Sequence, residues 1–263
     1  MKRISYLLIL ACVMLPAWAW AQSGFDGTWV IDTHSVSTKG GKPDIEVLQH
    51  GTYWCKSCEP PYHIKADGQF HKVTGQSKFD NEAVQVVDAH TVKFTDKKDG
   101  KPPVVYVVTA APDGHTERVS VSSTVNGHPV KMHQTNVREA KGPAGSHAIS
   151  GTWRIQGYDH VSEGLRTMTL AVRDHVLHTS SPIKKKAMSL KLDGTATPIP
   201  DGNSGETLSA TMPNANTVRE ERKRNGKLVA VTTYTLAPDG KRIHLVSRNV
   251  KDGGEFSGTM IKQ

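Results

Sequence analysis

The feature of the sequence that most constrains its fold is an internal repeat. Gly27-Thr28-Trp29 recurs as Gly151-Thr152-Trp153, 124 residues further on, and four other segments recur in the same order at an offset of 126. Those four begin at Lys65, Asp88, Asp99 and Ala111 and match segments that begin at Lys191, Asn214, Asn225 and Ala237. A period of this length is the size of a small domain and is far longer than a solenoid repeat.

The repeat divides the chain into two related units, which we expect at residues 22–140 and 149–263. The segment between them, residues 141–148, is rich in Gly, Pro and small residues and is therefore predicted to be a linker. Two separate cores, and a single large barrel or sandwich made of two fused halves, would both satisfy this pattern.

Both units carry the sequence pattern of antiparallel β structure. Apolar residues alternate with polar ones, as in residues 91–95, 104–109 and 229–236, and no segment after residue 21 shows the spacing of an amphipathic helix. Asp-Gly and Asn-Gly pairs, which suit tight hairpin turns, separate these stretches. We therefore predict an all-β chain of two tandem antiparallel meanders, each able to close into a barrel and so remove its edges.

Residues 1–21 have the pattern of a secretory signal peptide of bacterial style. Lys2 and Arg3 precede an apolar run that ends in the small-x-small site Ala19-Trp20-Ala21. We expect cleavage after Ala21 and a periplasmic or secreted protein. An uncleaved anchor is the alternative, but the run is short for a membrane span, and no transmembrane segment is expected after cleavage.

The repeated Gly-Thr-Trp resembles the Gly-x-Trp opening of lipocalins. The positions that match are Gly27, Trp29, Gly151 and Trp153. In that family the tryptophan plugs the closed end of an eight-stranded barrel and packs against an arginine of the last strand, for which Arg138 and Arg248 are candidates here. The whole mature chain looks like secreted bacterial proteins of two lipocalin-like (calycin-type) repeats, a group without an assigned function. The resemblance implies a fold and a compartment, not a reaction.

The sharpest chemical motif is Cys55-Lys56-Ser57-Cys58, which only the first unit carries. An oxidising compartment favours a local disulfide between Cys55 and Cys58, which would make this loop rigid. A thioredoxin-type redox site is an alternative that requires a helix beginning at the first cysteine. A zinc site is another, with His63 and His71 completing the four ligands.

Other function classes lack a signal in this sequence. There is no phosphate-binding loop, nucleophile elbow, dinucleotide fingerprint or His-x-His pair. Aromatic residues make up only 6% of the chain, which argues against a nucleic-acid platform despite the net charge of +8. The basic run at residues 219–224 is predicted to be a solvated hairpin face, with contact to anionic lipid, polysaccharide or another polyanion as the alternative.

The sequence therefore predicts an exported, non-catalytic binding or envelope-associated protein without a cofactor, a catalytic residue or a resident metal. Its partner would be a small apolar ligand held in the mouth of a barrel, or an envelope component. The alternative hypothesis is a periplasmic thiol redox or metal-handling protein that uses Cys55 and Cys58. The oligomeric state is left open.

Overall fold

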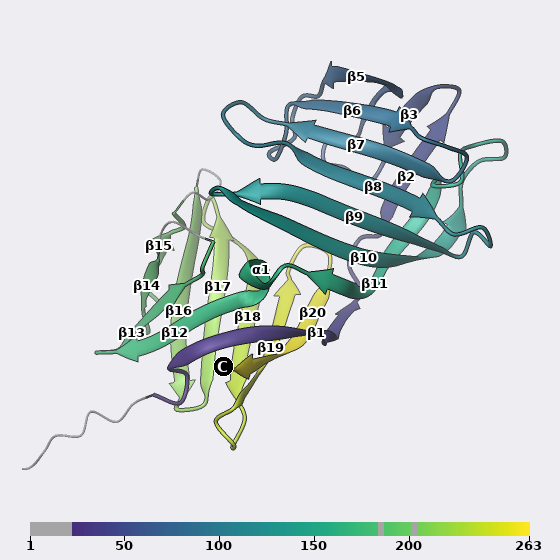
Figure 1. Cartoon of the computed structure of the whole chain (residues 1–263). Helices are drawn as coiled ribbons and strands as arrows, with labels where there is room; N and C mark the ends of the chain where they lie inside the picture. The colour runs from purple at the N-terminus through teal and green to yellow at the C-terminus, as the bar shows by residue number, and fades with distance from the viewer. Residues whose placement is uncertain (1–22, 184–186, 201–204) are drawn as a thin grey trace, which may run out of the picture.

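The computed structural model describes residues 23–183, 187–200 and 205–263, so the predicted signal peptide lies outside the described residues. Within those ranges, two ten-stranded antiparallel sheets each curl into a nearly closed barrel (Figure 1). This confirms the predicted all-β fold of two tandem barrel units. We call the two sheets barrel 1 and barrel 2.

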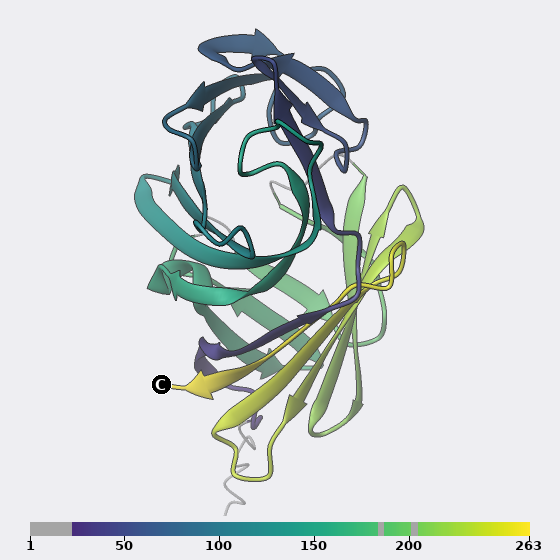
Figure 2. The same ribbon diagram turned by 90° about the vertical axis from the view of Figure 1, so that its right-hand side faces the viewer.

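Barrel 1 contains ten strands that are continuous in the chain. They are β2 (Asp44–Gln49), β3 (Thr52–Cys55), β4 (Tyr62–Lys65), β5 (Asp67–Lys72), β6 (Asn81–Val86), β7 (Thr91–Lys97), β8 (Val104–Ala110), β9 (Thr116–Val125), β10 (His128–Lys141) and β11 (Gly151–Val161). Their order across the sheet is β4-β3-β2-β11-β10-β9-β8-β7-β6-β5. The edge strands β4 and β5 are separated only by Ala66, so the two edges adjoin, and Figure 2 shows the resulting ring.

Barrel 2 combines the first strand of the chain with the last nine. These are β1 (Gly27–Lys39), β12 (Thr167–Arg173), β13 (Val176–Ser180), β14 (Met188–Lys191), β15 (Thr197–Pro198), β16 (Glu206–Asn214), β17 (Thr217–Arg224), β18 (Lys227–Leu236), β19 (Arg242–Asn249) and β20 (Glu255–Lys262), with the short helix α1 (Glu163–Arg166) preceding β12. The order is β14-β13-β12-β1-β20-β19-β18-β17-β16-β15. A bridge between Asp193 and Thr211 ties the two edges together.

The first strand of each sequence unit completes the other barrel. β1 pairs with β12 and β20 of barrel 2, whereas β11 pairs with β2 and β10 of barrel 1. The chain leaves barrel 2 through Gly40–Pro43 and returns after Val161. The units at 22–140 and 149–263 therefore match the two copies of the sequence repeat, but their boundaries do not match those of the barrels. The pairing partners of a strand, and not its order in the chain, decide which sheet it joins.

The sequence predicted that the Gly/Pro-rich segment at 141–148 is a linker between the two units. This prediction is wrong, because the segment does not connect the barrels. It lies inside barrel 1, between β10 and β11, where the Gly142 N–H donates to the Ser150 carbonyl at 3.1 Å. Small residues are needed here because a Cβ at Gly142 would lie 2.5 Å from the Ser150 side chain. The segment forms most of the connection between β10 and β11, and the His147 N–H donates to the Leu48 carbonyl of β2 at 2.8 Å.

A buried tryptophan closes one end of each barrel, and we call the opposite end the mouth. Trp29 and Trp153 are fully buried, and each indole N–H donates to the carbonyl four residues earlier, at 2.8 Å for Phe25 and 2.7 Å for Ile149. The Arg138 guanidinium lies 3.9 Å from the centre of the Trp153 ring, and Lys262 occupies the matching place over Trp29 at 5.3 Å.

The prediction that Arg248 packs against a tryptophan is therefore wrong. Arg248 is 71% exposed and pairs with Glu255 at 2.7 Å, away from Trp29. Lys262 takes its place because it lies directly opposite Trp29 in the pairing register, as Arg138 lies opposite Trp153. Gly27 and Gly151 leave room for these long cationic side chains, since an added Cβ would approach Lys262 to 2.7 Å and Arg138 to 2.5 Å.

Candidate functional site

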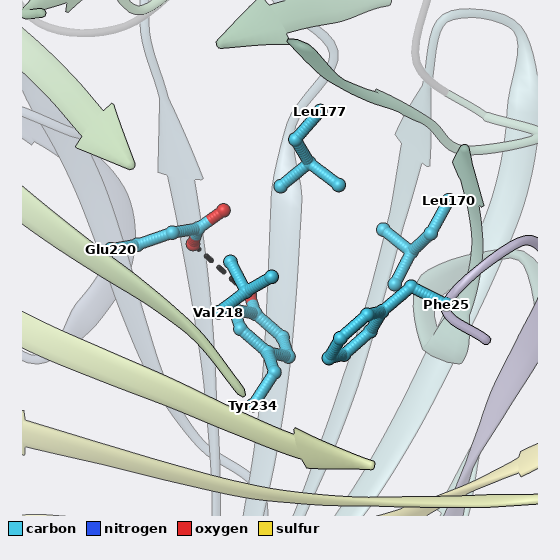
Figure 3. A pocket seen from close by; sticks show the side chains of 6 residues that line it. All are labelled: Phe25, Leu170, Leu177, Val218, Glu220 and Tyr234. Atoms are coloured by element: carbon cyan, nitrogen blue, oxygen red, sulfur yellow. Dashed lines mark hydrogen bonds between the residues drawn. The ribbon is translucent and has the colours of Figure 1, made fainter. Parts of the chain in front are cut away.

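The closed end of barrel 2 is filled by its own side chains (Figure 3). The residues that meet there are Phe25, Leu170, Leu177, Val218, Glu220 and Tyr234. The gaps between them total about 200 Å³ and leave no room for a water molecule. The Tyr234 hydroxyl donates to Glu220 at 3.1 Å. This part of the barrel is therefore core, and a small apolar ligand has no space among these six side chains.

The mouth of barrel 2 carries charged side chains on the same inner face. Residues two apart in a strand share a face, so Arg222 and Arg224 continue the inward row of Val218 and Glu220 towards the end of β17. Glu206 lies directly opposite Arg224 on β16 and is buried. The basic run that the sequence placed on a solvated hairpin face thus sends two of its arginines to the inside of the mouth.

Glu206 holds both arginines in place. Its Oε2 accepts from the Arg222 amino group at 2.8 Å, and its Oε1 accepts from Arg224 Nε and Nη2 at 3.0 and 2.7 Å. Burial opposes ionisation of Glu206, but the hydrogen bonds and charges of Arg224 and Arg222 outweigh it and lower the pKa of this carboxyl to about 2. The two guanidinium groups remain about half exposed, at 44% and 51%.

Barrel 1 reaches over this mouth and encloses a groove of about 420 Å³. We call it the inter-barrel groove; its lining residues are Lys42, Pro43, Asp44, Ser57, Glu59, Arg222, Arg224, Val229, Ala230, Asn249, Lys251 and Asp252. They come from the crossover after β1 and the start of β2, from the loop between β3 and β4, and from the mouth of barrel 2. Two regions far apart in the sequence, residues 42–59 and 222–252, therefore build one site.

The loop between Cys55 and Tyr62 is the part of barrel 1 that docks on this mouth. Glu59 pairs with Lys42 at 3.4 Å and with Lys251 of barrel 2. Lys42 Nζ also donates to the Ser57 carbonyl at 2.9 Å, and the Ser57 hydroxyl accepts the Ile45 N–H at 2.9 Å. The loop is thus bound to its own barrel and to barrel 2.

Cys55 and Cys58 are joined by a disulfide, with their Cα atoms 5.4 Å apart. Cys55 ends strand β3 and is buried in the core of barrel 1. The chain then turns through the loop to β4, so the helix that a thioredoxin-type site requires does not begin here. The geometry of the pair is that of a brace for the docking loop.

The histidines proposed as zinc ligands do not gather around these cysteines. His63 lies opposite Trp54, and its side chain is exposed, whereas Cys55 points into the barrel. His71 is bonded to Asp67 at 2.8 Å. Among the residues that the structure describes, no group of three or more His, Cys, Asp or Glu side chains has the arrangement of a metal site.

Barrel 1 contains a second group of charged residues that the sequence argument missed. Four acidic side chains point into the barrel: Glu46, Glu82, Asp96 and Glu117. The alternation around residues 82–84 and 92–96 already places Glu82 and Asp96 on the apolar face of their strands. Hydrogen bonds from Tyr53 to Glu46, Tyr62 to Glu82 and Asn136 to Glu117 measure 3.1, 2.8 and 2.8 Å.

These carboxyls share too few donors. Within the described part of the chain, Asp96 Oδ1 and Glu117 Oε2 are buried without a hydrogen-bond partner. Burial raises the pKa of Glu117 to about 7, against the lowering influence of Asn136 and Arg138. Burial also raises the pKa values of Glu82 and Asp96, which face each other across β6 and β7. The group therefore carries protons at mildly acidic pH.

No helix among the described residues is long and apolar enough to cross a membrane. Comparisons with protein-family models, curated proteins and solved structures find no significant match to this chain.

Proposed function

We propose that this chain is an exported, non-catalytic binding protein of two lipocalin-like barrels that holds a small polar ligand in the inter-barrel groove. One observation carries the proposal: side chains from two distant regions of the chain, residues 42–59 and 222–252, converge on a groove of about 420 Å³ over the mouth of barrel 2. Small-molecule sites typically measure roughly 300–1,000 Å³ and favour junctions between domains and the mouths of barrels.

Export is supported by residues 1–21 and by the paired cysteines. The signal pattern at the N-terminus predicts secretion, and a disulfide persists most readily in an oxidising compartment such as the periplasm. The Gly-x-Trp motif and its buried tryptophans support the lipocalin-like relationship. In such barrels the ligand enters at the end opposite the tryptophan, which is where the groove lies.

The chemistry of the groove favours a polar ligand over the small apolar ligand that the lipocalin resemblance suggested. Seven of its lining residues carry a charge: Lys42, Asp44, Glu59, Arg222, Arg224, Lys251 and Asp252. The apolar space deeper in barrel 2 is occupied by Phe25 and its neighbours. A ligand of the groove would therefore be recognised by hydrogen bonds and charge.

Native mass spectrometry of protein purified from the periplasm of a bacterial host tests this function. We expect a small molecule to be retained by the wild type and lost from Ala230→Trp, which fills the groove. Val87→Trp is the control, since residue 87 is 55% exposed on barrel 1 and outside the groove. Retention of the molecule by Ala230→Trp, or the absence of any bound molecule, would contradict the proposal.

A further inference from the structure

We infer that the ligand of the inter-barrel groove carries a phosphoryl group, bound between Arg222 and Arg224 on one wall and Lys42 and Lys251 on the other. The inference rests on the proposed function and names the chemical class of its ligand. Two observations support it: four cations surround one groove, and the two carboxylates Glu206 and Glu59 are each paired with two of these cations.

We call the side of the groove formed by Arg222 and Arg224 the arginine wall, and its two guanidinium groups are already oriented for an anion. Arg222 and Arg224 lie on one face of β17, and Glu206 holds both from beneath. A guanidinium has five N–H donors, of which Glu206 occupies one on Arg222 and two on Arg224. Among the described residues the remaining donors have no other hydrogen-bond partner, so they can bind a ligand in the groove. Bidentate Arg–phosphate pairs use this planar geometry, and prior orientation lowers the entropy lost on binding.

The opposite wall holds a carboxylate of the chain itself in the place where an anionic ligand would sit. Glu59 is 58% exposed and lies between Lys42, in the crossover after β1, and Lys251, in the turn between β19 and β20. Because Glu59 belongs to the disulfide-braced loop, it can move aside only with that loop or by rotation of its side chain. Glu59 therefore acts as a built-in competitor that a ligand anion would displace from the two lysines.

The distribution of charge favours an anion beside the arginines. Over the whole groove, the four cations are balanced by Glu206, Glu59 and two further carboxylates, but Arg222 and Arg224 share only Glu206 and therefore keep a local positive excess. The other two carboxylates of the groove, Asp44 and Asp252, lie beside Lys42, and Asp252 accepts the backbone N–H groups of Lys42 and Gly254 at 3.4 and 2.9 Å. The arginine wall is thus the more positive one. A phosphate monoester offers two charges and several oxygen acceptors, and the groove leaves space for the organic part that carries it.

Isothermal titration calorimetry at low ionic strength tests the inference with four probes: inorganic phosphate, glycerol 3-phosphate, glucose 6-phosphate and glucose. We expect the phosphates to bind and glucose not to bind. Preference for glycerol 3-phosphate would indicate a lipid headgroup as the source, and preference for glucose 6-phosphate a soluble sugar phosphate. We expect Arg222→Gln/Arg224→Gln to weaken binding at least tenfold and Glu59→Gln to strengthen it severalfold.

Arg219→Gln is the matched control. Arg219 lies on the outer face of the same strand, where it pairs with Glu221, so Arg219→Gln removes one of the strand's arginine charges without touching the groove. Lys251→Gln, in the turn between β19 and β20, serves as a second groove variant if the double variant does not fold. An equal loss of binding in Arg219→Gln would overturn the inference, because it would indicate unspecific attraction of anions.

The same experiments separate the two levels of the proposal. If no phosphate binds while native mass spectrometry finds a neutral or cationic molecule that Ala230→Trp excludes, the phosphoryl inference fails and the groove remains the binding site. If neither method finds a ligand that depends on the groove, both fail.

Discussion

Barrel 1 and barrel 2 are built on the same pairing register, yet their interiors differ in polarity. Positions that occupy the same place in the two registers are Glu46 and Leu170, Tyr53 and Leu177, Glu82 and Leu208, Glu117 and Ile243, and Asn136 and Met260. The first residue of each pair belongs to barrel 1. One strand plan therefore supports a hydrogen-bonded polar interior in one barrel and, apart from the Glu220–Tyr234 pair, a mainly apolar interior in the other.

The pleat of a strand therefore decides to which face of the sheet a side chain points, but it does not decide whether that side chain is polar or apolar. Barrel 1 keeps its charges inside, among tyrosines and one arginine. In barrel 2, Glu220 is buried beside Tyr234, and the other inward charges, Glu206 and its two arginines, lie at the mouth. The barrels differ also in continuity: barrel 1 is one uninterrupted stretch, whereas barrel 2 needs β1 from the other end of the chain.

This difference in continuity predicts the largest effect. A fragment of residues 42–162 should fold alone, because it contains every strand of barrel 1. A fragment of residues 163–263 should not, because its sheet would be open between β12 and β20; a peptide of residues 23–41 added in trans should restore folding. Circular dichroism melting of the fragments checks this. A cooperative transition in the second fragment without the peptide would show that β1 is dispensable for barrel 2.

The carboxyls of the two barrels predict opposite responses to pH. In barrel 1 burial raises carboxyl pKa values, to about 7 for Glu117, so the folded state binds protons more tightly than the unfolded state. Its stability should be highest near pH 4.5 and fall as the pH rises through 7, by on the order of 3 kcal/mol for Glu117. In barrel 2 the pKa of Glu206 is lowered to about 2, so this contribution is present above pH 4.5 and lost as the pH falls towards 2.

Hydrogen exchange measured by mass spectrometry at pH 5 and pH 8, corrected for intrinsic exchange rates, resolves the two barrels separately. Protection of barrel 1 should decrease at the higher pH, and Glu117→Gln should reduce that decrease. Equal changes in both barrels, or no effect of Glu117→Gln, would mean that these buried groups do not govern the stability of barrel 1.

The glycine of the repeated motif predicts a smaller local effect. A Cβ at Gly151 would lie 2.6 Å from the Ala140 carbonyl oxygen and 2.5 Å from Arg138, and the backbone oxygen cannot move aside easily. Gly151→Ala should destabilise barrel 1 by about 3 kcal/mol, at the upper end for overpacking. Gly157→Ala on the same strand is the control, because no heavy atom lies within 4 Å of its added Cβ. Urea denaturation that gives equal losses for both variants would argue against this steric role.

The smallest effect is expected at the disulfide. Cys55→Ser/Cys58→Ser should cost at most about 2 kcal/mol, because the closed loop is short. Faster hydrogen exchange should be confined to residues 56–61 and to their contact with Lys251. A global loss of protection in barrel 1 would indicate that the disulfide supports the whole barrel and not only the docking loop.

Much of the local structure was readable in the sequence because it depends on neighbouring residues. Alternation predicted the strands, and the Asp-Gly and Asn-Gly pairs predicted the turns; Gly68, Gly114 and Gly226 do adopt positive φ angles of 75°, 70° and 76°. The disulfide followed from two cysteines three residues apart. The tryptophan motif also marked a residue that closes each barrel.

The sequence by itself therefore determined the strand period, the turns and the two buried tryptophans. Only the tertiary structure decided that β1 joins barrel 2, that Lys262 and not Arg248 covers Trp29, and that Glu59 meets Lys251 across the groove. Periodicity and turn chemistry act over a few residues, whereas pairing partners and grooves depend on segments far apart in the chain, such as Trp29 and Lys262, which are 233 residues apart. The burial and hydrogen bonding of the complete fold select among the pairings that the local pattern allows.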